Sequence, residues 1–191
     1  MSFDNDKKVF LGKQDKSRKG GIDKNIKGLV DLINKNPCYY TTSSCAGRIV
    51  LLKPAEHNRK DKAEWLFVSH EKIGKKQHDQ LKDSLRNPPN ETVWFKQEGA
   101  ILHVRCRAFD DAVRLVKASK EAAFKHAGIS SFGRKIMVEV IDTERIDAPV
   151  SREGKLIVDD DYLRFLFEEC NSKLSRTIKK IRRMEKYIKK L

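Results

Sequence analysis

The segment from Asp160 to the C-terminus carries the pattern that most limits the folds open to this chain. Its apolar positions recur at spacings of three and four residues, which is the repeat of an α-helix with one face in a protein core. The stripe consists of Phe167, Cys170, Leu174, Thr177, Ile181, Met184, Ile188 and Leu191. We therefore predict one long amphipathic helix at about 160–190.

The other positions of this predicted helix are strongly basic, and Glu185 is the only acid from Lys173 onward. The cations are Lys173, Arg176, Lys179, Lys180, Arg182, Arg183, Lys186, Lys189 and Lys190. A run of charges is usually a solvated face. Like charges at this density repel one another, however, and a bound polyanion would offset that cost. We expect RNA phosphate contacts from Lys179, Lys180, Arg182, Arg183 and Lys186.

The charge of the whole chain indicates the same class of partner. The 191 residues include 41 Lys and Arg against 27 Asp and Glu, which gives a formal net charge of +14. Net charge bears on partners and not on fold, and nucleic acid is the most common polyanion to bind such a surface. No apolar run is long enough to cross a membrane, and the N-terminus lacks the apolar core of a secretory signal. We therefore expect a cytoplasmic protein.

Length and element order favour one α+β domain over residues 1–191. A hydrophobic content of 39% can supply one sizeable core. A hairpin is predicted at 92–97 and 100–107, and a helix is predicted from Asp110 to Ala127, with Gly128 at its end. Strands and helices do not alternate one for one, so we expect a mixed or antiparallel sheet flanked by helices. No G-x-G-x-x-G turn occurs, so we do not expect a Rossmann-type fold.

A polar run of eight residues, Thr41 to Arg48, lies between two apolar, strand-like segments. It reads TTSSCAGR and contains four hydroxyls, a thiol and a guanidinium. This composition is too polar for a strand that crosses a core. The small residues and the glycine let the backbone come close to a ligand. We expect the run to line a binding site.

The cysteines offer little for metal binding. No C-x-x-C pair occurs and no histidine follows at zinc-ligand spacing, so we expect no metal site. Without a secretory signal, disulfides are not expected either. Cys106 and Cys170 fall on apolar faces and are predicted to be core residues, whereas Cys45 has polar neighbours.

A series of motifs resembles a known family and covers most of the chain. The motifs are Asp15–Asp23 (DKSRKGGID), Ile33-Asn34, the TTSSCAGR run, Trp65–His70 (WLFVSH), Ile101–Cys106 (ILHVRC), Gly128–Ser130, Pro149 and Glu168–Asn171. In this order the chain resembles the wybutosine-synthesis methyltransferases that act third in that tRNA modification pathway. TTSSCAGR followed by VSH and LHVRC is the specific part of the likeness. Any one of these motifs alone would be weak.

The resemblance implies a reaction and a partner. Members of that family use S-adenosylmethionine to methylate ring nitrogen 4 of the tricyclic base 3′ of the anticodon in phenylalanine tRNA. The partner would then be the anticodon loop of phenylalanine tRNA, with no stable protein partner implied. Because the sulfonium is already a strong electrophile, the protein has to align the methyl group, exclude water and remove a proton.

Histidine is the natural group for that proton removal, because its pKa lies near neutral pH. We expect His70, at the end of a predicted strand, to be the general base, with His103 as the second candidate. For either residue the alternative is a structural hydrogen bond. The remaining histidines, His57, His78 and His126, lie in charged segments and are expected to be exposed.

Six further residues are expected to bind the cofactor or the substrate: Ser43, Ser44, Cys45, Gly47, Arg48 and Arg105. Arg48 would pair with the cofactor carboxylate or with a tRNA phosphate, or else form a structural salt bridge. The serines would donate hydrogen bonds to the cofactor or base, or cap a turn. Arg105 alternates with His103 and Arg107 on one basic strand face.

Two other functions are compatible with the sequence. A non-catalytic RNA-binding accessory protein would keep the basic helix but would not bind S-adenosylmethionine. An RNA-modifying enzyme could instead use Cys45 as a covalent nucleophile, although methyl transfer to nitrogen needs no such intermediate. Binding of S-adenosylmethionine would separate the first of these from a methyltransferase.

Overall fold

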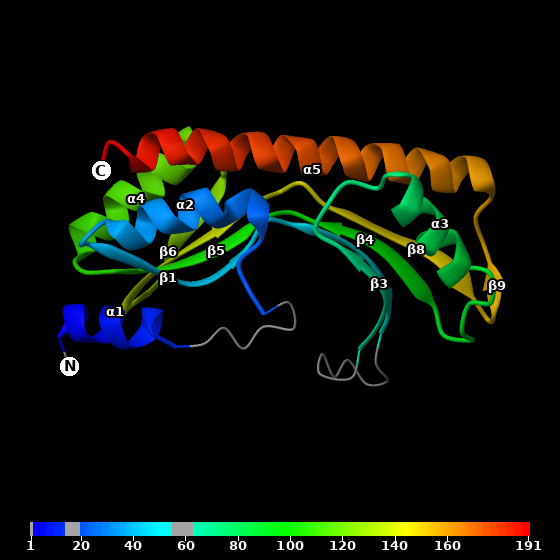
Figure 1. Ribbon diagram of the computed structural model, residues 1–191, viewed down its shortest axis with the longest axis horizontal. Coiled ribbons are helices and arrows are strands. Elements are labelled where there is room, and N and C mark those ends of the chain that lie inside the picture. Colours follow the sequence, from blue (N-terminus) through cyan, green and yellow to red (C-terminus); the bar gives the residue numbers. More distant parts are fainter. Residues whose placement is uncertain (1, 14–19, 55–62) are drawn as a thin grey trace. The chain divides into compact units, whose positions relative to one another are not determined.

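The computed structural model describes residues 2–13, 20–54 and 63–191, and the chain folds as two compact units (Figure 1). The first unit comprises Met1–Ala46, Ala100–Thr143 and Thr177–Leu191, and the second comprises Gly47–Gly99 and Glu144–Arg176. Each unit contains one antiparallel sheet with helices, so the predicted α+β class is confirmed. A single domain over the whole chain stays a prediction.

The first unit is built on a four-stranded sheet of order β1-β5-β7-β6. Its strands are β1 (Tyr39–Cys45), β5 (Ile101–Cys106), β6 (His126–Phe132) and β7 (Ile136–Ile141). Side chains alternate between the two faces of each strand. Leu102, Val104 and Cys106 of β5 are almost fully buried on one face, where they join the apolar core.

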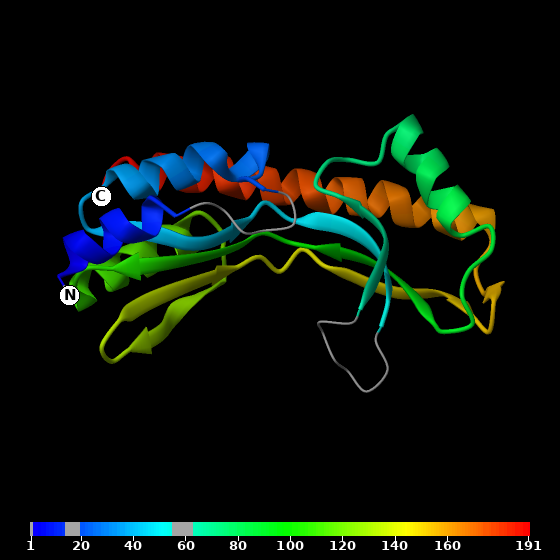
Figure 2. The same cartoon turned by 60° about the horizontal axis from the view of Figure 1, so that its bottom comes forward.

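Four helical segments accompany this sheet. They are α1 (Phe3–Leu11), α2 (Lys24–Lys35), α4 (Phe109–Glu121) and the C-terminal part of α5 (Asp160–Ile188). The apolar stripes of α2, α4 and α5 share one core with β5 and β7, so these helices cover one face of the sheet. Helix α1 lies on the opposite face of this sheet (Figures 1 and 2). There the rings of Phe3 and Phe10 pack 5.4 and 5.5 Å from the ring of Tyr40.

The second unit is built on a five-stranded sheet of order β3-β2-β4-β8-β9. Its strands are β2 (Arg48–Lys53), β3 (Glu64–Ser69), β4 (Val93–Glu98), β8 (Ile146–Arg152) and β9 (Lys155–Leu156). Helix α3 (Lys75–Ser84) and the N-terminal part of α5 belong to the same unit. Phe167 and Cys170 of α5 are buried there, as the apolar stripe predicts, and Leu163 one turn earlier is buried as well.

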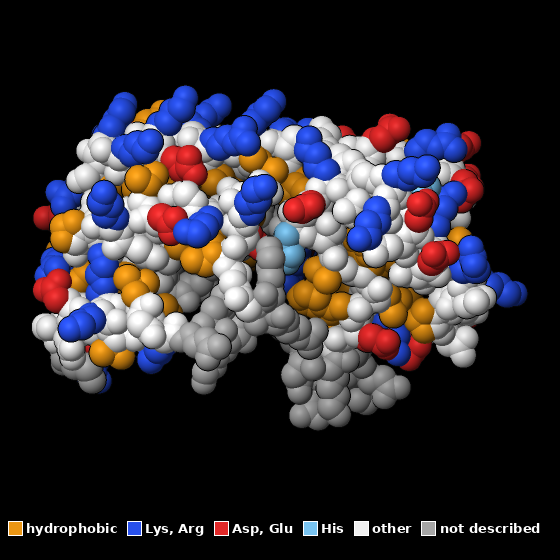
Figure 3. Space-filling model, in the orientation of Figure 1, with side chains coloured by type: hydrophobic (Ala, Val, Ile, Leu, Met, Phe, Trp, Pro, Cys, Tyr) orange, Lys and Arg blue, Asp and Glu red, His pale blue; other side chains and the backbone are white. Residues whose placement is uncertain are grey.

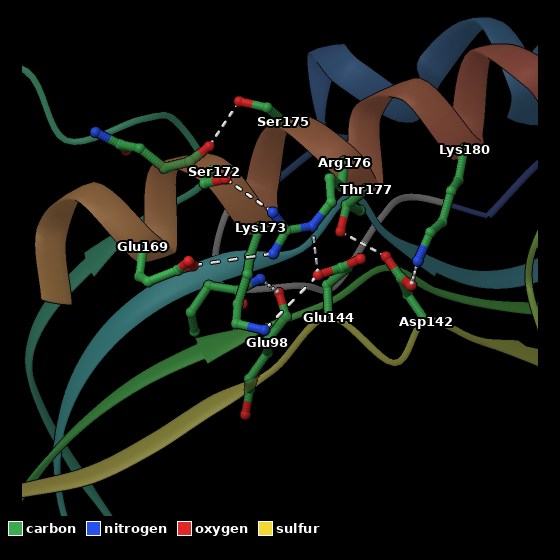
Figure 4. Close-up of polar contacts among 12 residues, drawn as sticks. Glu98, Asp142, Glu144, Glu169, Ser172, Lys173, Ser175, Arg176, Thr177 and Lys180 are labelled. Carbon is green, nitrogen blue, oxygen red and sulfur yellow. Dashed lines mark hydrogen bonds and ion pairs between the residues drawn. The ribbon is translucent and has the colours of Figure 1, made fainter.

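Acidic residues of the segment between β7 and β8 hold α5 in each unit (Figure 4). In the first unit, the Asp142 carboxylate accepts hydrogen bonds from Thr177 Oγ1 at 2.5 Å and Lys180 Nζ at 2.7 Å. In the second unit, Glu144 pairs with Arg176 at 3.0 Å and with Lys173 at 3.8 Å. Two carboxylates of one short segment, Asp142 and Glu144, thus form ion pairs with cations of α5.

The helix predicted from Asp110 to Ala127 is shorter than expected, and this prediction is wrong at its C-terminal end. Helix α4 stops at Glu121, and the chain enters β6 at His126. Ala123 adopts a left-handed φ of 74°, its N–H bonds the carbonyl of Lys120, and the N–H of Phe124 bonds the carbonyl of Ser119. This Schellman pattern usually takes glycine. Burial of the Phe124 ring in the core offsets the strain at the preceding alanine.

Candidate functional site

The face of the first sheet that is opposite α2, α4 and α5 carries polar side chains at its centre. On β5, Ile101, His103 and Arg105 point to this face, because Leu102 and Val104 between them point into the core. The predicted polar face of this strand is therefore confirmed for His103 and Arg105. We call this face, which carries Ile101, His103 and Arg105 of β5, the open face.

A β-bulge in the TTSSCAGR run decides which of its side chains reach the open face. Thr41 pairs with Val104 and Ser43 pairs with His103, so two steps along β1 correspond to one step along β5. The extra residue, Thr42, shifts Ser43 onto the same face as His103. Asn34 of α2 holds the bulge, because its Oδ1 accepts hydrogen bonds from the backbone N–H of Thr41 at 2.7 Å and from the Thr41 hydroxyl at 3.1 Å.

Ser43, His103 and Glu139 form a hydrogen-bonded row across three neighbouring strands on the open face. Ser43 Oγ lies 2.6 Å from His103 Nδ1, and His103 Nε2 lies 2.7 Å from Glu139 Oε1. The side chains of His103 and Glu139 are 34% and 39% exposed, so the row is accessible without being fully solvated. An imidazole that lies between a hydroxyl and a carboxylate is chemically able to accept a proton and pass it on.

The sequence did not single out Glu139. It stands between Val138 and Val140 in a strand that is otherwise apolar, and an isolated acid of this kind is a weak signal. Its partnership with His103 depends on the pairing of β5 with β7, which matches these two residues directly. Only the register between strands could have revealed it.

The guanidinium group of Arg105 is held by hydrogen bonds to backbone carbonyls of its own sheet. Its side chain is buried, and Nη1 donates to the carbonyls of Cys106 at 2.8 Å and Ile136 at 3.2 Å. The ring of Phe3 lies 5.8 Å from the guanidinium carbon. These contacts connect the strands to α1 and leave Arg105 little freedom to bind a ligand.

The other residues of the TTSSCAGR run divide between the two faces and the two units. Ser44 lies opposite Leu102 on the core side, and Cys45 lies opposite Ile101 on the open face. The backbone N–H of the buried Ala46 donates to Asp23 Oδ2 at 2.8 Å, which links this run to the end of the DKSRKGGID motif. Residues 15–19 of that motif lie outside the described residues.

A second group of predicted residues gathers at one end of the five-stranded sheet. Arg48 Nε lies 2.5 Å from Glu98 Oε2, and its guanidinium carbon lies 4.4 Å from the centre of the Trp65 ring. Gly47 has a left-handed φ of 95°, and a Cβ atom there would lie 2.8 Å from the Glu98 carbonyl oxygen. Arg48 therefore forms the salt bridge that the sequence left as an alternative, and Gly47 is required by the turn.

His70 belongs to this second group. Ile49 of β2 pairs with Ser69 of β3, which places His70 beside Arg48 at the same end of the sheet. The loop after His70 is anchored by Asn171 of α5, whose side chain accepts from the Ile73 N–H at 2.7 Å and donates to the Ile73 carbonyl at 2.9 Å. Asn171 belongs to the Glu168–Asn171 motif, and these two hydrogen bonds explain why an asparagine suits this position: its side chain both accepts from and donates to the backbone of Ile73.

The remaining histidines lie elsewhere. His78 packs edge-on against the Phe167 ring at 5.3 Å and is thus partly covered, contrary to the expected exposure. His126 is exposed at the start of β6, as predicted. His57 lies outside the described residues.

The basic face of α5 is real, but one of its predicted phosphate contacts is used by the fold. Lys180 is 16% exposed and pairs with the fully buried Asp142 carboxylate. Four other cations, Lys179, Arg182, Arg183 and Lys186, are exposed, and within the described ranges no carboxylate forms an ion pair with them. Figure 3 shows Lys and Arg side chains gathered over the C-terminal part of this helix. We call these four residues the basic helix patch.

Two cysteines behave as core residues. Burial raises the pKa of Cys106 and of Cys170 to about 12, so neither thiol is ionised near neutral pH. Both predictions of a core position are confirmed. In the part of the chain that the structure describes, none of the four cysteines forms a disulfide.

Fold and site together define an α+β protein outside the Rossmann class, with a histidine-centred polar row on one sheet face and a basic helix over the other. Across the described segments, no helix is both long and apolar enough to span a membrane.

Comparison with known proteins identifies the family. Residues 5–190 match the family described as Methyltransferase TYW3. The chain is 34% identical over 175 residues to the tRNA(Phe) 7-((3-amino-3-carboxypropyl)-4-demethylwyosine(37)-N(4))-methyltransferase 1 of Pyrococcus abyssi, covering 91% of this chain and 89% of the relative. It is also 34% identical to the tRNA wybutosine-synthesizing protein 3 homolog of Xenopus laevis, covering 99% of this chain and 75% of that protein.

A solved structure agrees with this assignment. A Pyrococcus horikoshii protein superposes with a TM-score of 0.82 at 32% identity, covering 90% of this chain and 87% of that one. The chain belongs to the TYW3 methyltransferase family. The resemblance seen in the sequence motifs is confirmed.

Proposed function

We propose that the protein transfers a methyl group from S-adenosylmethionine to ring nitrogen 4 of the 4-demethylwyosine-type base 3′ of the anticodon in phenylalanine tRNA. The observation that carries this proposal is the match to the methyltransferase family over residues 5–190, together with relatives that are named for this reaction. Because the substrate is tRNA, we place the reaction in the cytoplasm.

The residues at the end of the five-stranded sheet fit part of the methyl donor. S-adenosylmethionine carries a carboxylate and an ammonium group on its methionine portion. Arg48 and Glu98 are both half-buried and pair with each other at 2.5 Å, so binding of this zwitterion would replace their mutual ion pair with one pair to its carboxylate and one to its ammonium group. When bound, the donor supplies the electrophilic methyl group. Gly47, directly before Arg48, lets the backbone pass close to the Glu98 carbonyl oxygen.

The basic helix patch supports binding of tRNA but not recognition of the base. The patch lies on the helix that covers the core face of the first sheet, whereas His103 lies on the open face. A tRNA base held near His103 therefore cannot also touch Arg182 or Arg183. We infer that the patch contacts phosphates of the anticodon arm and contributes affinity that does not depend on sequence.

The reaction itself is the first test. Purified protein is incubated with S-adenosylmethionine and phenylalanine tRNA from cells that lack the modification, and the digested nucleosides are examined by mass spectrometry. We expect the tricyclic base to gain the mass of one CH2 group. No gain, combined with silence in calorimetry with S-adenosylmethionine, would refute the methyltransferase and favour a non-catalytic RNA-binding protein.

The second test neutralises the basic helix patch by the combined substitutions Lys179→Gln, Arg182→Gln, Arg183→Gln and Lys186→Gln. Each lost phosphate contact removes about 0.7–0.9 from the slope of log K against log salt, so four contacts remove roughly 3. Turnover at saturating tRNA should stay within a few-fold.

A matched control removes the same charge from cations that already face a carboxylate. These are Lys82, Arg86, Arg152 and Arg164, each within 3.4 Å of an acidic oxygen. Their replacement by glutamine should leave the salt slope almost unchanged. Equal losses in both variants would mean that only net charge matters, and the patch would then not be a binding surface.

A further inference from the structure

We propose that Ser43, His103 and Glu139 form a proton relay that accepts the proton of the nitrogen being methylated, with Glu139 as the positioning residue. The inference rests on the proposed function and deepens it, because it assigns the route by which the substrate loses its proton. Ser43 is the member that touches the substrate. His103 and Glu139 act through it.

The register of three strands brings these groups together. Ser43 of β1 pairs with His103 of β5, and His103 pairs with Glu139 of β7, so the three side chains stand in one row on one face. The two hydrogen bonds of 2.6 and 2.7 Å occupy both ring nitrogens of the imidazole. Both bonds are short and join directly opposed residues, which holds the ring in one orientation.

The carboxylate decides which ring nitrogen carries the proton. An ionised carboxylate can only accept, so Nε2–H of His103 donates to Glu139. In the neutral ring Nδ1 is then the acceptor, and the Ser43 hydroxyl donates to it. In this tautomer the hydroxyl proton of the exposed Ser43 is used in the bond to His103, and its oxygen still has two lone pairs that can accept a proton.

The local backbone supports a role beyond holding the sheet together. Regular alternation from Tyr39 would have put Thr42 opposite His103 and turned Ser43 into the core. The bulge brings Ser43 to His103 instead, and Asn34 fixes the bulge at Thr41. Bulges are over-represented at sheet edges, such as the edge that β1 forms here, and next to active sites, where they re-aim a side chain.

The proton leaves the substrate as the methyl group is transferred. The ring nitrogen forms a bond to the methyl carbon as the bond between that carbon and the donor sulfonium breaks, and the sulfur keeps the electron pair. The N–H proton passes to Ser43 Oγ while the Ser43 proton passes to His103 Nδ1. The imidazolium that results is stabilised by Glu139. It returns its proton to solvent before the next turnover.

The tautomer is measured first, on the free protein, by the nitrogen-15 shifts of the His103 ring. We expect wild-type His103 to show a protonated Nε2 and a bare Nδ1. In Glu139→Ala this preference should be lost and the two tautomers should mix. An unchanged tautomer in Glu139→Ala would refute the positioning role.

Single-turnover rates give the second readout. Ser43→Ala and His103→Ala should each slow methyl transfer by roughly a hundredfold or more, the usual scale for lost proton transfer. Glu139→Ala should slow it by about tenfold, and adding it to Ser43→Ala should cost nothing further, because the residues act as one unit. Binding of tRNA and of S-adenosylmethionine should stay within about threefold. Glu121→Ala, at the exposed end of α4, is the matched control and should leave the rate of methyl transfer unchanged.

The outcomes separate the two proposals. A wild-type protein that transfers no methyl group overturns the proposed function, and the relay with it. An active wild type whose Ser43 and Glu139 variants keep their rates overturns the relay alone, and His70→Ala then tests the other histidine. Loss of the Ser43 rate together with loss of tRNA binding would mean that Ser43 is a binding residue only.

Discussion

Removal of the Asn34 side chain should destabilise the fold and also loosen the Ser43–His103 hydrogen bond on the open face. In Asn34→Ala, the backbone N–H and the hydroxyl of Thr41 both lose their acceptor, and Thr41 is only 7% exposed. A buried N–H left unsatisfied costs about 1–3 kcal/mol, and a lost net hydrogen bond costs about 0.5–1.5 kcal/mol. Alanine recovers about 0.5 kcal/mol of helix propensity in α2. The expected net loss is therefore about 2 kcal/mol.

Urea unfolding followed by circular dichroism measures this loss. With a slope near 2 kcal/mol per molar urea, the midpoint should fall by about 1 M. Asn34→Asp is the matched variant, because a carboxylate oxygen can accept both hydrogen bonds from Thr41. We expect it to keep most of the stability that alanine loses.

The same variants test the connection to the site. If Asn34 holds the bulge, Asn34→Ala should also loosen the Ser43–His103 hydrogen bond and mix the tautomers of His103, whereas Asn34→Asp should preserve them. A midpoint shift below about 0.3 M in Asn34→Ala, or equal losses in both variants, would refute this reasoning about the acceptor.

Three further predictions concern single positions. Ala123→Gly should raise the free energy of unfolding by up to about 1 kcal/mol in urea titrations, because φ is 74° there; a loss of stability would contradict the Schellman assignment. Gly47→Ala should cost more than about 1 kcal/mol, since its Cβ would meet a backbone oxygen at 2.8 Å, and a neutral thermal melt would disprove this. Because burial raises the pKa of Cys106 and Cys170 to about 12, iodoacetamide at neutral pH should alkylate both only after unfolding; native labelling detected by mass spectrometry would exclude the buried positions.

Much of the architecture could be predicted because its signals are local. The apolar stripe from Phe167 to Ile188 predicted α5 within a few residues, and the alternation around His103 predicted its polar face. Both patterns follow from the fixed geometry of a single helix or strand, so they can be recognised from the spacing of neighbouring residues alone. The motif series likewise needed only the linear order of residues, and it led to the family.

Other features depended on competition between local preference and packing. Gly128 appeared to end the helix that follows Asp110, but the chain turns at Ala123 because Phe124 enters the core. Lys180 could not be told apart from Lys179 or Arg183 in the sequence. Only its distance to the buried Asp142 separates an ion pair of the fold from a cation available to RNA.

Most contacts of the candidate site depend on how the strands pair in the folded protein, and the sequence alone did not reveal them. His103 and Ser43 could be named from the sequence, yet alternation along β1 places Ser43 on the wrong face, and nothing near Glu139 indicates a partner. The bulge at Thr42 and the pairing of β5 with β7 set these contacts. Register is fixed by the energy of a whole sheet, whose paired strands lie far apart along the chain, and by side chains on neighbouring elements such as Asn34 of α2, which holds the bulge at Thr41. A sequence therefore determines which side chains can do the chemistry, and the long-range pairing of strands determines which of them meet.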